Sequence, residues 1–487
     1  MIERSDVIII GGGFGGISVA RELAKSSCRV TIIDKNNHHL FQPLLYQVAT
    51  AALSPGDIAI PIRAMFSKDE NISVIMDQVM AVNKEGRSVR LRSGREISYD
   101  YLVMAPGAVY NYFGNDHWKS YAPGLKSISD SLSVRETIIL SLETAEHLEH
   151  PVDREPWLTF AVIGGGPTGV EMAGAIAEIA KRSMMRDYRN LIRDDTRVYL
   201  IEAGPRILNG YPESLSRKAQ KELEGMGVKV LLNSPVNDIT ENGVTIDNQT
   251  IRTPNIIWAA GVIASPLVNK LGVEQDRTGR VMVEDDMSLK GFPNLFVIGD
   301  AAHATNEKGE PLPAVAPVAI QQGKYVGSLI RKRQSREERK PFRYKDKGTM
   351  ATIGRAKAVA EIRGWHFTGF IAWALWSVVH IFFLIGFRNR FRVFAEWIWY
   401  YFTFKRGVRL ITRKKPRHRY QDAGFIDTTE DDEDDPDDLD ASSGHDSSGH
   451  DSSDPASTGH DEPSTGNAER AERAEPEPEH QHDSDSE

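Results

Sequence analysis

Two short segments of the chain contain glycines at a spacing that serves phosphate binding. Both have the pattern G-x-G-x-x-G, and their glycines are Gly11, Gly13, Gly16 and Gly164, Gly166, Gly169. In such a loop the first glycine permits a tight turn, the second lets a pyrophosphate approach the backbone, and the third lets helix and strand pack closely. Phosphate oxygens then lie at the N-terminus of the following helix, where free N–H groups and the helix dipole favour negative charge.

An acidic residue follows each loop at the distance expected for one βαβ unit. Asp34 ends the apolar run "RVTIID", and Glu202 ends the similar run "RVYLIE". A carboxylate at this place accepts hydrogen bonds from a ribose diol and repels a 2′-phosphate. Glu202 therefore predicts NADH rather than NADPH, although the nearby Arg206 weakens that preference. A glycine turn without a ligand is the alternative, and the complete strand, helix and acid context argues against it.

The elements that must position these residues occur twice in the same order. Strand, glycine turn, helix and strand are predicted over 6–34 and again over 158–202. Two βαβ units imply two parallel sheets with right-handed crossovers. Because 487 residues are also too many for one core, we expect at least two domains.

The net charge of −9 conceals two segments of opposite sign. Residues 427–487 contain 23 Asp or Glu and two Arg, so they carry −21 and the remainder of the chain carries +12. A basic body indicates an anionic partner such as a nucleotide, a nucleic acid or lipid headgroups. The tail has no aromatic residue after Phe425, so we expect it to be disordered. Its repeated His–Asp pairs favour a solvated low-complexity segment over a metal site, and no metal is predicted.

An apolar, aromatic region precedes the tail. Its two runs are 368–387 and 393–404, and basic residues lie on both sides of the first. Twenty residues at ~1.5 Å each would reach about 30 Å, the thickness of a bilayer core. A single crossing would place a basic cluster on each side, against the usual charge bias, and the second run is too short to return. We therefore expect 365–419 to hold the chain on a membrane surface, with a buried dimer interface as the main alternative.

Two further segments resemble the two-dinucleotide-binding-domain flavoproteins, the pyridine nucleotide–disulfide reductase superfamily. They are "LVMAPGA" at 102–108 and "LFVIGDAA" at 295–302. The resemblance implies FAD, bound non-covalently, in the first βαβ unit and NADH in the second. It also implies that Gly107 belongs to the FAD site and that Asp300 holds the ribityl chain. Disulfide reductases of this superfamily use a cysteine pair, whereas this chain has only Cys28, so its electrons must pass to a bound acceptor.

A closer resemblance is to the type II (alternative) NADH:quinone oxidoreductases. It rests on "HHLFQPLLYQVATAALSP" at 38–55, "GPTGVEMAGAIAEI" at 166–179 and "GTMATIGRAKAV" at 348–359, and it extends over roughly 5–415. Many members of that family carry A-Q-x-A-x-Q near the quinone. Here the stretch is "APVAIQQ", with Pro317 in place of the first Gln, so one polar quinone contact of the family is missing.

This resemblance implies roles for individual residues. Ala319 and Gln321 match the family motif; Ala319 is expected at the FAD, and Gln321 and Gln322 are the candidate quinone contacts. Glu171, at the start of the helix after the second loop, is expected near nicotinamide and flavin as an aid to proton delivery. The alternative role for Glu171 is that of an acid without a catalytic function, stabilised only by the helix dipole. Lys347 is expected near flavin or quinone, with a surface lysine as the alternative.

The predicted fold class is α/β, with two Rossmann-like dinucleotide-binding domains, a C-terminal helical membrane-anchoring segment and a disordered acidic tail. The expected divisions are 1–120 and 285–345 for the FAD domain, 121–155 for a connecting helical segment, 156–284 for the NADH domain, 346–420 for the anchoring region and 421–487 for the tail.

The predicted function is that of an NADH dehydrogenase on a membrane surface. A hydride would pass from NADH to FAD, and two electrons would then pass to a lipid quinone, ubiquinone or menaquinone. No array of transmembrane helices is visible, so we expect no proton pumping. We expect a homodimer, peripheral (monotopic) on the cytoplasmic face of the inner membrane, with no nucleic-acid partner. The alternatives are a soluble NADH:acceptor reductase of the ferredoxin or rubredoxin type, and a redox-sensing interaction protein.

Overall fold

The computed structural model describes residues 5–179, 187–403 and 408–411. The chain divides into two units, Met1–Asp427 and Thr428–Glu487, and every element described below belongs to the first. The expected acidic tail therefore lies outside the described residues, as does most of the basic stretch before it.

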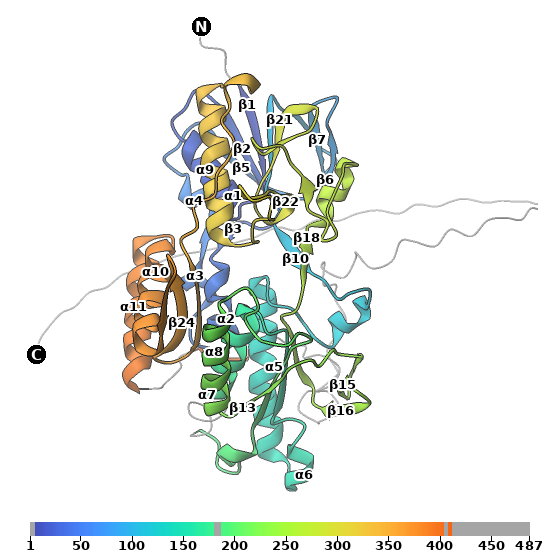
Figure 1. Cartoon of the computed structure of the whole chain (residues 1–487), viewed down its shortest axis with the longest axis vertical. Coiled ribbons are helices and arrows are strands. Elements are labelled where there is room, and N and C mark those ends of the chain that lie inside the picture. The colour runs from blue at the N-terminus through green and yellow to red at the C-terminus, as the bar shows by residue number, and fades with distance from the viewer. Residues whose placement is uncertain (1–4, 180–186, 404–407, 412–487) are drawn as a thin grey trace, which may run out of the picture. The chain divides into compact units, whose positions relative to one another are not determined.

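The first domain is built on a six-stranded sheet in the order β20-β21-β9-β1-β2-β5 (Figure 1). Its strands are β1 (Asp6–Ile10), β2 (Arg29–Asp34), β5 (Ile72–Met76), β9 (Tyr101–Met104), β20 (Ser288–Leu289) and β21 (Phe292–Val297). Neighbouring strands are parallel except for β20 and β21. Alternate residues of β1 enter two different hydrophobic clusters, Ile9 in one and Ile8 in the other. Both faces of the sheet are thus covered, which explains why the run "VIII" is apolar at every position.

Two helices pack against each other beside this sheet, α1 (Phe14–Leu23) and α9 (Ala316–Lys332). A Cβ at Gly323 would collide with the backbone of Gly15, so glycine at this position lets the two helices approach closely. The smaller elements of the domain are β3 (His38–Leu40), α2 (Leu45–Ala49), α3 (Pro55–Ile58), β4 (Ala59–Pro61), α4 (Ile62–Met65), β6 (Val79–Asn83), β7 (Ser88–Leu91), β8 (Glu96–Ser98), β19 (Val281–Met282) and β22 (Ala302–His303).

The second domain has a four-stranded parallel sheet in the order β13-β12-β11-β17. Its main elements are α5 (Ile128–His147), α6 (Pro151–Arg154), β11 (Thr159–Ile163), α7 (Pro167–Glu178), β12 (Arg197–Ile201), α8 (Glu213–Gly225), β13 (Val228–Leu231) and β17 (Asn255–Trp258). An antiparallel meander precedes β17; it consists of β14 (Asp238–Thr240), β15 (Gly243–Ile246) and β16 (Gln249–Arg252). The two expected βαβ units are thus both present.

The chain passes between the two domains at a two-stranded antiparallel ladder. Its strands are β10 (Ala108–Tyr110) and β18 (Val262–Ala264). Tyr112 and Trp118 already pack in the core of the second domain, whereas Val268 and Val281 pack against the first. The boundaries therefore differ from the expected 120 and 284, because the ladder lies about ten residues before the first and twenty before the second.

The C-terminal region begins with a sheet, although the sequence predicted only helical anchoring from residue 346. Strands β23 (Thr349–Gly354), β24 (Lys357–Ile362) and β25 (Trp365–Thr368) form an antiparallel meander. β23 packs on α7 of the second domain, where a Cβ at Gly174 would collide with the carbonyl oxygen of Ile353. The meander therefore joins the C-terminal region to the helix that follows the second glycine loop.

Two helices follow this meander, α10 (Gly369–Phe383) and α11 (Phe387–Thr403). The apolar run of twenty residues is helical only as far as Phe383, and Gly386, with φ +88°, lies in the bend that follows. α10 thus has 15 residues and a length of about 22 Å. Within 5–179, 187–403 and 408–411, no helix is long and apolar enough to cross a membrane. Large apolar side chains are nevertheless exposed on both helices: Phe370, Ile371, Val378, Phe382, Phe391, Phe394, Ile398, Trp399 and Phe402.

Candidate active site

The glycines of the first loop meet three different geometric requirements. Gly11 has φ +98°, and a Cβ there would collide with the carbonyl oxygen of Ala105. A Cβ at Gly16 would collide with the carbonyl oxygen of Gly11, so helix and strand are packed tightly. A Cβ at Gly13, in contrast, would meet no atom within 4 Å, which leaves open space over its backbone. The loop thus has the shape that close approach of a pyrophosphate requires.

Asp34 and His39 fix the conformation of this loop. The Asp34 carboxylate accepts hydrogen bonds of 2.6 Å from the N–H of Gly12 and 2.7 Å from that of Asn36. Burial raises the pKa of Asp34, and the two backbone donors oppose that shift. Nδ1 of the buried His39 donates a 2.8 Å hydrogen bond to the carbonyl oxygen of Gly12, and burial lowers the pKa of His39 to about 4. A neutral imidazole and a carboxylate therefore bind the carbonyl oxygen and the N–H of the same residue, Gly12.

The second loop repeats this geometry. Gly164 has φ +109°, and a Cβ at Gly169 would collide with its carbonyl oxygen. A Cβ at Gly166 would meet nothing within 4 Å. The Glu202 carboxylate accepts a 2.5 Å hydrogen bond from the N–H of Gly165, as Asp34 does in the first domain. Both loops thus fit a dinucleotide, with an acid at the end of the second strand in each.

Arg206 is held by its own turn. Its guanidinium donates 2.8 Å and 2.7 Å hydrogen bonds to the carbonyl oxygens of Tyr211 and Asn209. Two of its donor groups are therefore in use, and Glu202 is the acid beside the second loop. This arrangement favours a free 2′-hydroxyl over a 2′-phosphate.

The remaining candidates for FAD binding lie near one another in the first domain. Burial raises the pKa of Asp300, and the charges of Lys126 and Arg280 oppose that shift. Ala319 is buried on α9, and its Cβ lies 3.4 Å from the Cβ position of the glycine that precedes Asp300. Gly107 has φ +73°, with nothing within 4 Å of its Cβ position. Lys126, which the sequence did not single out, thus provides a cation beside the expected ribityl-binding acid.

The side chains of three other candidates have different partners in the structure. Gln322 is buried, and its Oε1 accepts a 2.7 Å hydrogen bond from the N–H of Gly299. Gln321 forms two 3.0 Å hydrogen bonds with the backbone of Lys345. Lys347 is exposed, with its ammonium 5.6 Å from the ring centre of Phe383. Gln322 therefore supports the loop that carries Asp300, and Gln321 is hydrogen-bonded to the segment around Lys345 that precedes β23.

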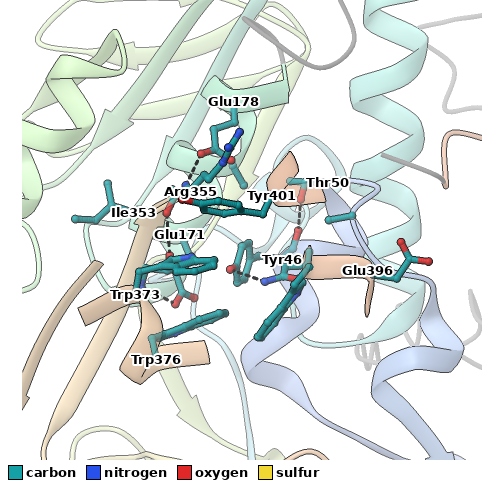
Figure 2. Close-up of a pocket in the computed structure, with 16 residues that line it drawn as sticks. Tyr46, Thr50, Glu171, Glu178, Ile353, Arg355, Trp373, Trp376, Glu396 and Tyr401 are labelled. Atoms are coloured by element: carbon teal, nitrogen blue, oxygen red, sulfur yellow. Dashed lines mark hydrogen bonds between the residues drawn. The ribbon is translucent and has the colours of Figure 1, made fainter. Parts of the chain in front are cut away.

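A pocket lies where α7, α2 and the C-terminal region meet (Figure 2). Glu171 is one of its lining residues, but among the described residues around it Gln321, Gln322 and Lys347 do not appear. Its walls are rich in aromatic side chains with a few charged groups. The lining residues are Tyr46, Gln47, Thr50, Ala52, Glu171, Ala175, Glu178, Thr352, Ile353, Gly354, Arg355, Trp373, Trp376, Glu396, Trp397 and Tyr401.

Glu171 is the enclosed acid of this pocket. Its Oε1 accepts a 3.4 Å hydrogen bond from the N–H of Thr352 on β23. Burial raises the pKa of Glu171 to about 8; the N–H groups of Thr352 and Trp376 oppose the shift only in part. The indole nitrogen of Trp376 is buried without a hydrogen bond of normal geometry among the described residues, so we regard its effect as weak. Glu171 therefore holds a proton over much of the physiological pH range, as a general acid must.

Hydrogen bonds link the opposite wall of the pocket to the first domain. The indole N–H of Trp397, on α11, donates a 2.8 Å hydrogen bond to Oε1 of Gln47. Nε2 of Gln47 in turn donates one of 2.8 Å to the hydroxyl oxygen of Tyr46. Trp376 packs with Trp397 at 5.3 Å and stacks on His380 at 4.1 Å between ring centres. The aromatic wall is therefore continuous from α10 through α11 to α2.

Comparisons with known proteins agree with these sites. Residues 5–323 match the family model for pyridine nucleotide-disulphide oxidoreductases, and residues 347–406 match that for the NDH2 C-terminal domain. A type II NADH:quinone oxidoreductase of Mycobacterium tuberculosis is 41% identical, covering 84% of this chain and 91% of its own. The chain belongs to the type II NADH:quinone oxidoreductases. A second such enzyme of the same organism is also 41% identical, covering 81% of this chain and 86% of its own.

The fold agrees as well. A solved structure of NDH2 from Plasmodium falciparum in complex with NADH has a TM-score of 0.76, with 21% identity over 82% of this chain and 99% of its own. The predicted family is thus confirmed, and with it an FAD-dependent enzyme that oxidises NADH and reduces a quinone. The two alternatives, a ferredoxin- or rubredoxin-type reductase and a redox-sensing interaction protein, are not supported.

Several pocket residues of this type II enzyme were not predicted individually. Tyr46 and Gln47 lie inside the segment 38–55 that carried the resemblance, but nothing in their spacing placed them near Glu171. Arg135, on α5, is not among the described lining residues of the pocket; it is buried, and its Nε and Nη1 lack a hydrogen-bond partner among the described residues. Its burial could not be predicted from the sequence, because it depends on how α5 is covered in the fold.

Proposed function

We propose that this type II enzyme reduces a lipid quinone in the pocket beside Glu171, while it rests on a membrane surface. The observation that carries the proposal is a half-buried acid with a pKa of about 8 in a pocket lined by aromatic side chains. Quinone headgroups are planar and apolar and become basic as they accept electrons. Aromatic walls and one protonated acid therefore suit both the binding and the protonation of such a substrate.

The two glycine loops supply the cofactor sites in this proposal. FAD would be held by Gly11, Gly13, Gly16, Asp34, Gly107, Asp300 and Ala319. NADH would be held by Gly164, Gly166, Gly169 and Glu202. FAD, once bound, supplies the hydride-accepting and electron-donating chemistry. The chain itself orients the two dinucleotides, excludes water from the region between them and holds a proton on Glu171.

The exposed apolar face of α10 and α11 would lie against the lipid. Phe391, Phe394 and Phe402 follow one side of α11 at helical spacing and are 69%, 51% and 75% exposed. Exposed aromatic side chains in such number are costly in water and typical of interfacial helices. Type II NADH dehydrogenases are peripheral membrane enzymes, and the α10–α11 face is a surface through which this one could bind.

Three finer points stay predictions. We expect the enzyme on the cytoplasmic face of the inner membrane, and we expect a homodimer that uses a surface other than the α10–α11 face. Either ubiquinone or menaquinone would fit a wall of aromatic side chains. Initial rates with both quinones in the same vesicles would identify the preferred acceptor.

The quinone pocket is tested by Glu171→Gln, which keeps the shape of the side chain and removes the proton that it can donate. We expect kcat with a water-soluble quinone to fall about tenfold or more. Ferricyanide accepts electrons without protons, so NADH:ferricyanide activity should stay near that of the native enzyme. If Glu171→Gln kept the same fraction of native activity with quinone as with ferricyanide, quinone would not be protonated from this pocket.

A further inference from the structure

Helix α7 carries a second acid that faces the same pocket. Glu171 and Glu178 are seven residues apart, which is two helical turns, so they lie on one side of α7 about 10 Å from each other. Within 171–179 these two are the residues that keep accessible surface, while all those between them are buried. Both line the pocket, with the small Ala175 between them.

Strand β23 and the turn that follows it hold the two carboxylates through backbone N–H groups. The N–H of Thr352 donates to Glu171 at 3.4 Å, and the N–H of Arg355 donates to Glu178 at 2.5 Å. The chain from Thr352 to Arg355 can span at most about 10 Å, which is compatible with the separation of the two acids on the helix. Strand and helix thus present the acids as a matched pair along one wall, as Figure 2 shows.

The reaction itself requires a path of this kind. NADH, one proton and a quinone give NAD⁺ and a quinol, so each turnover takes up one proton from solvent. Glu171 is enclosed, and a proton given to quinone must be replaced before the next turnover. The pocket has an internal volume of about 70 Å³, and a water needs roughly 10–15 Å³ of such space. Several waters could therefore bridge the distance between the two acids.

We propose that Glu178 is the outer station of a proton path that runs along α7 to Glu171. It rests on the assignment of this pocket to quinone reduction. The protonated Glu171 gives its proton to the reduced quinone and is left as a carboxylate. That carboxylate is then reprotonated through pocket water by Glu178, which in turn takes up a proton from solvent. No atom is oxidised or reduced along the path; one O–H bond forms as another breaks at each step.

Other charged or titratable groups face this path from every neighbouring element. They are Tyr46 from α2, Arg355 from the turn after β23, Glu396 and Tyr401 from α11, and Tyr211 from the loop before α8, whose pKa is raised by burial and by the charge of Glu171. The guanidinium of Arg355 lies 4.3 Å from the ring centre of Tyr401, at the same end of the pocket as Glu178. Arg355 and Tyr401 thus line the end of the pocket at Glu178, and Trp376 lines the end at Glu171.

The test compares Glu178→Gln with Glu178→Asp in the full-length, FAD-loaded enzyme, using a water-soluble quinone and ferricyanide as acceptors. For Glu178→Gln we expect kcat with quinone to fall about fivefold to tenfold and its solvent deuterium isotope effect to rise. Its ferricyanide activity should be unchanged, and Glu178→Asp should regain most of the quinone activity. Glu224→Gln makes the same exchange at an exposed acid on α8 and should change neither acceptor.

Three results would overturn the proposal. The first is a native rate and isotope effect for Glu178→Gln with quinone, while Glu171→Gln is impaired. The second is an equal loss with both acceptors, which would mean that Glu178 only anchors β23. The third is native quinone activity in both Glu178→Gln and Glu171→Gln; this would refute the quinone pocket itself, and the path with it.

Discussion

The indole N–H of Trp397 donates a 2.8 Å hydrogen bond to Oε1 of Gln47, joining two residues that lie 350 positions apart. Trp397 belongs to α11, whose opposite side is exposed and apolar, and Gln47 belongs to α2 of the first domain. This bond thus connects the proposed lipid-facing helix to the wall of the pocket. A movement of α11 on lipid would therefore shift the hydrogen bonds of Gln47 and Tyr46.

Removing this bond should weaken quinone binding more than catalysis. In Trp397→Phe the buried amide oxygen of Gln47 loses its donor, which costs about 1–3 kcal/mol. We expect KM for quinone to rise about fivefold or more, with KM for NADH unchanged. Trp399→Phe makes the same exchange at an exposed position on α11 and should behave as the native enzyme. If both variants show the same quinone KM, the bond has no role in the pocket.

Gly13→Val and Gly166→Val should separate the two dinucleotide sites. A Cβ at either glycine meets nothing within 4 Å, so the fold should be retained while the approach of a pyrophosphate is blocked. Purified Gly13→Val should lose most of its flavin absorbance at 450 nm. Gly166→Val should keep the flavin and show at least a tenfold higher KM for NADH. Gly210→Val, where the added side chain also meets open space, serves as control. Full flavin occupancy in Gly13→Val would refute the FAD assignment.

Glu202→Gln should shift the preference between nicotinamide nucleotides. Removal of the carboxylate relieves the repulsion of a 2′-phosphate, and we expect kcat/KM for NADPH relative to NADH to rise about tenfold. Steady-state kinetics with both nucleotides provide the ratio. Glu213→Gln removes a nearby exposed acid that pairs with Arg217 and should leave the ratio unchanged. An unchanged ratio in Glu202→Gln would mean that this acid does not contact the ribose.

The raised pKa of Glu171 should be visible in the stability of the enzyme. Its pKa is about 8 in the fold against an ordinary 4.5, so folding favours the protonated acid. The free energy of unfolding should therefore fall as pH rises from about 4.5 to about 8. Glu171→Gln stays neutral throughout; it should match the native enzyme near pH 4.5 and exceed it by roughly 2 kcal/mol at pH 9. The full pKa shift at ~1.4 kcal/mol per unit would give a larger difference. We expect less because Glu171 keeps contact with pocket solvent, which screens its charge. A Tm difference that is independent of pH would contradict the shift.

Replacing Phe391, Phe394 and Phe402 together by Asp should release the enzyme from lipid. Burying one phenylalanine is worth about 1.5–3 kcal/mol, so binding to vesicles should fall at least a hundredfold. NADH:ferricyanide activity should be retained, because these side chains point away from the pocket. Phe113→Asp, at a comparably exposed position near the domain ladder, should still sediment with vesicles. If the triple variant remained on vesicles but changed from dimer to monomer, the face would be a subunit interface.

The sequence by itself determined the two glycine loops, the acids Asp34 and Glu202, the α/β class and the family. These features are local: a loop, one strand and one helix within about forty residues decide whether a phosphate can approach the backbone. The acidic tail was predicted from composition alone, and it lies outside the described residues.

Only the tertiary structure decided where the domains begin, how the apolar run is divided and what surrounds Glu171. The ladder of β10 and β18 moves both domain boundaries. Helix α10 ends at Phe383, before a bend with a positive φ at Gly386, so the twenty-residue run contains a helix of only 15 residues. Tyr46, Thr352 and Trp397 line one pocket with Glu171 only because β23 packs on α7 and α11 packs on α3 and is hydrogen-bonded to α2 through Trp397. The shifted pKa of Glu171 follows from that enclosure, since desolvation depends on neighbours that are distant in sequence.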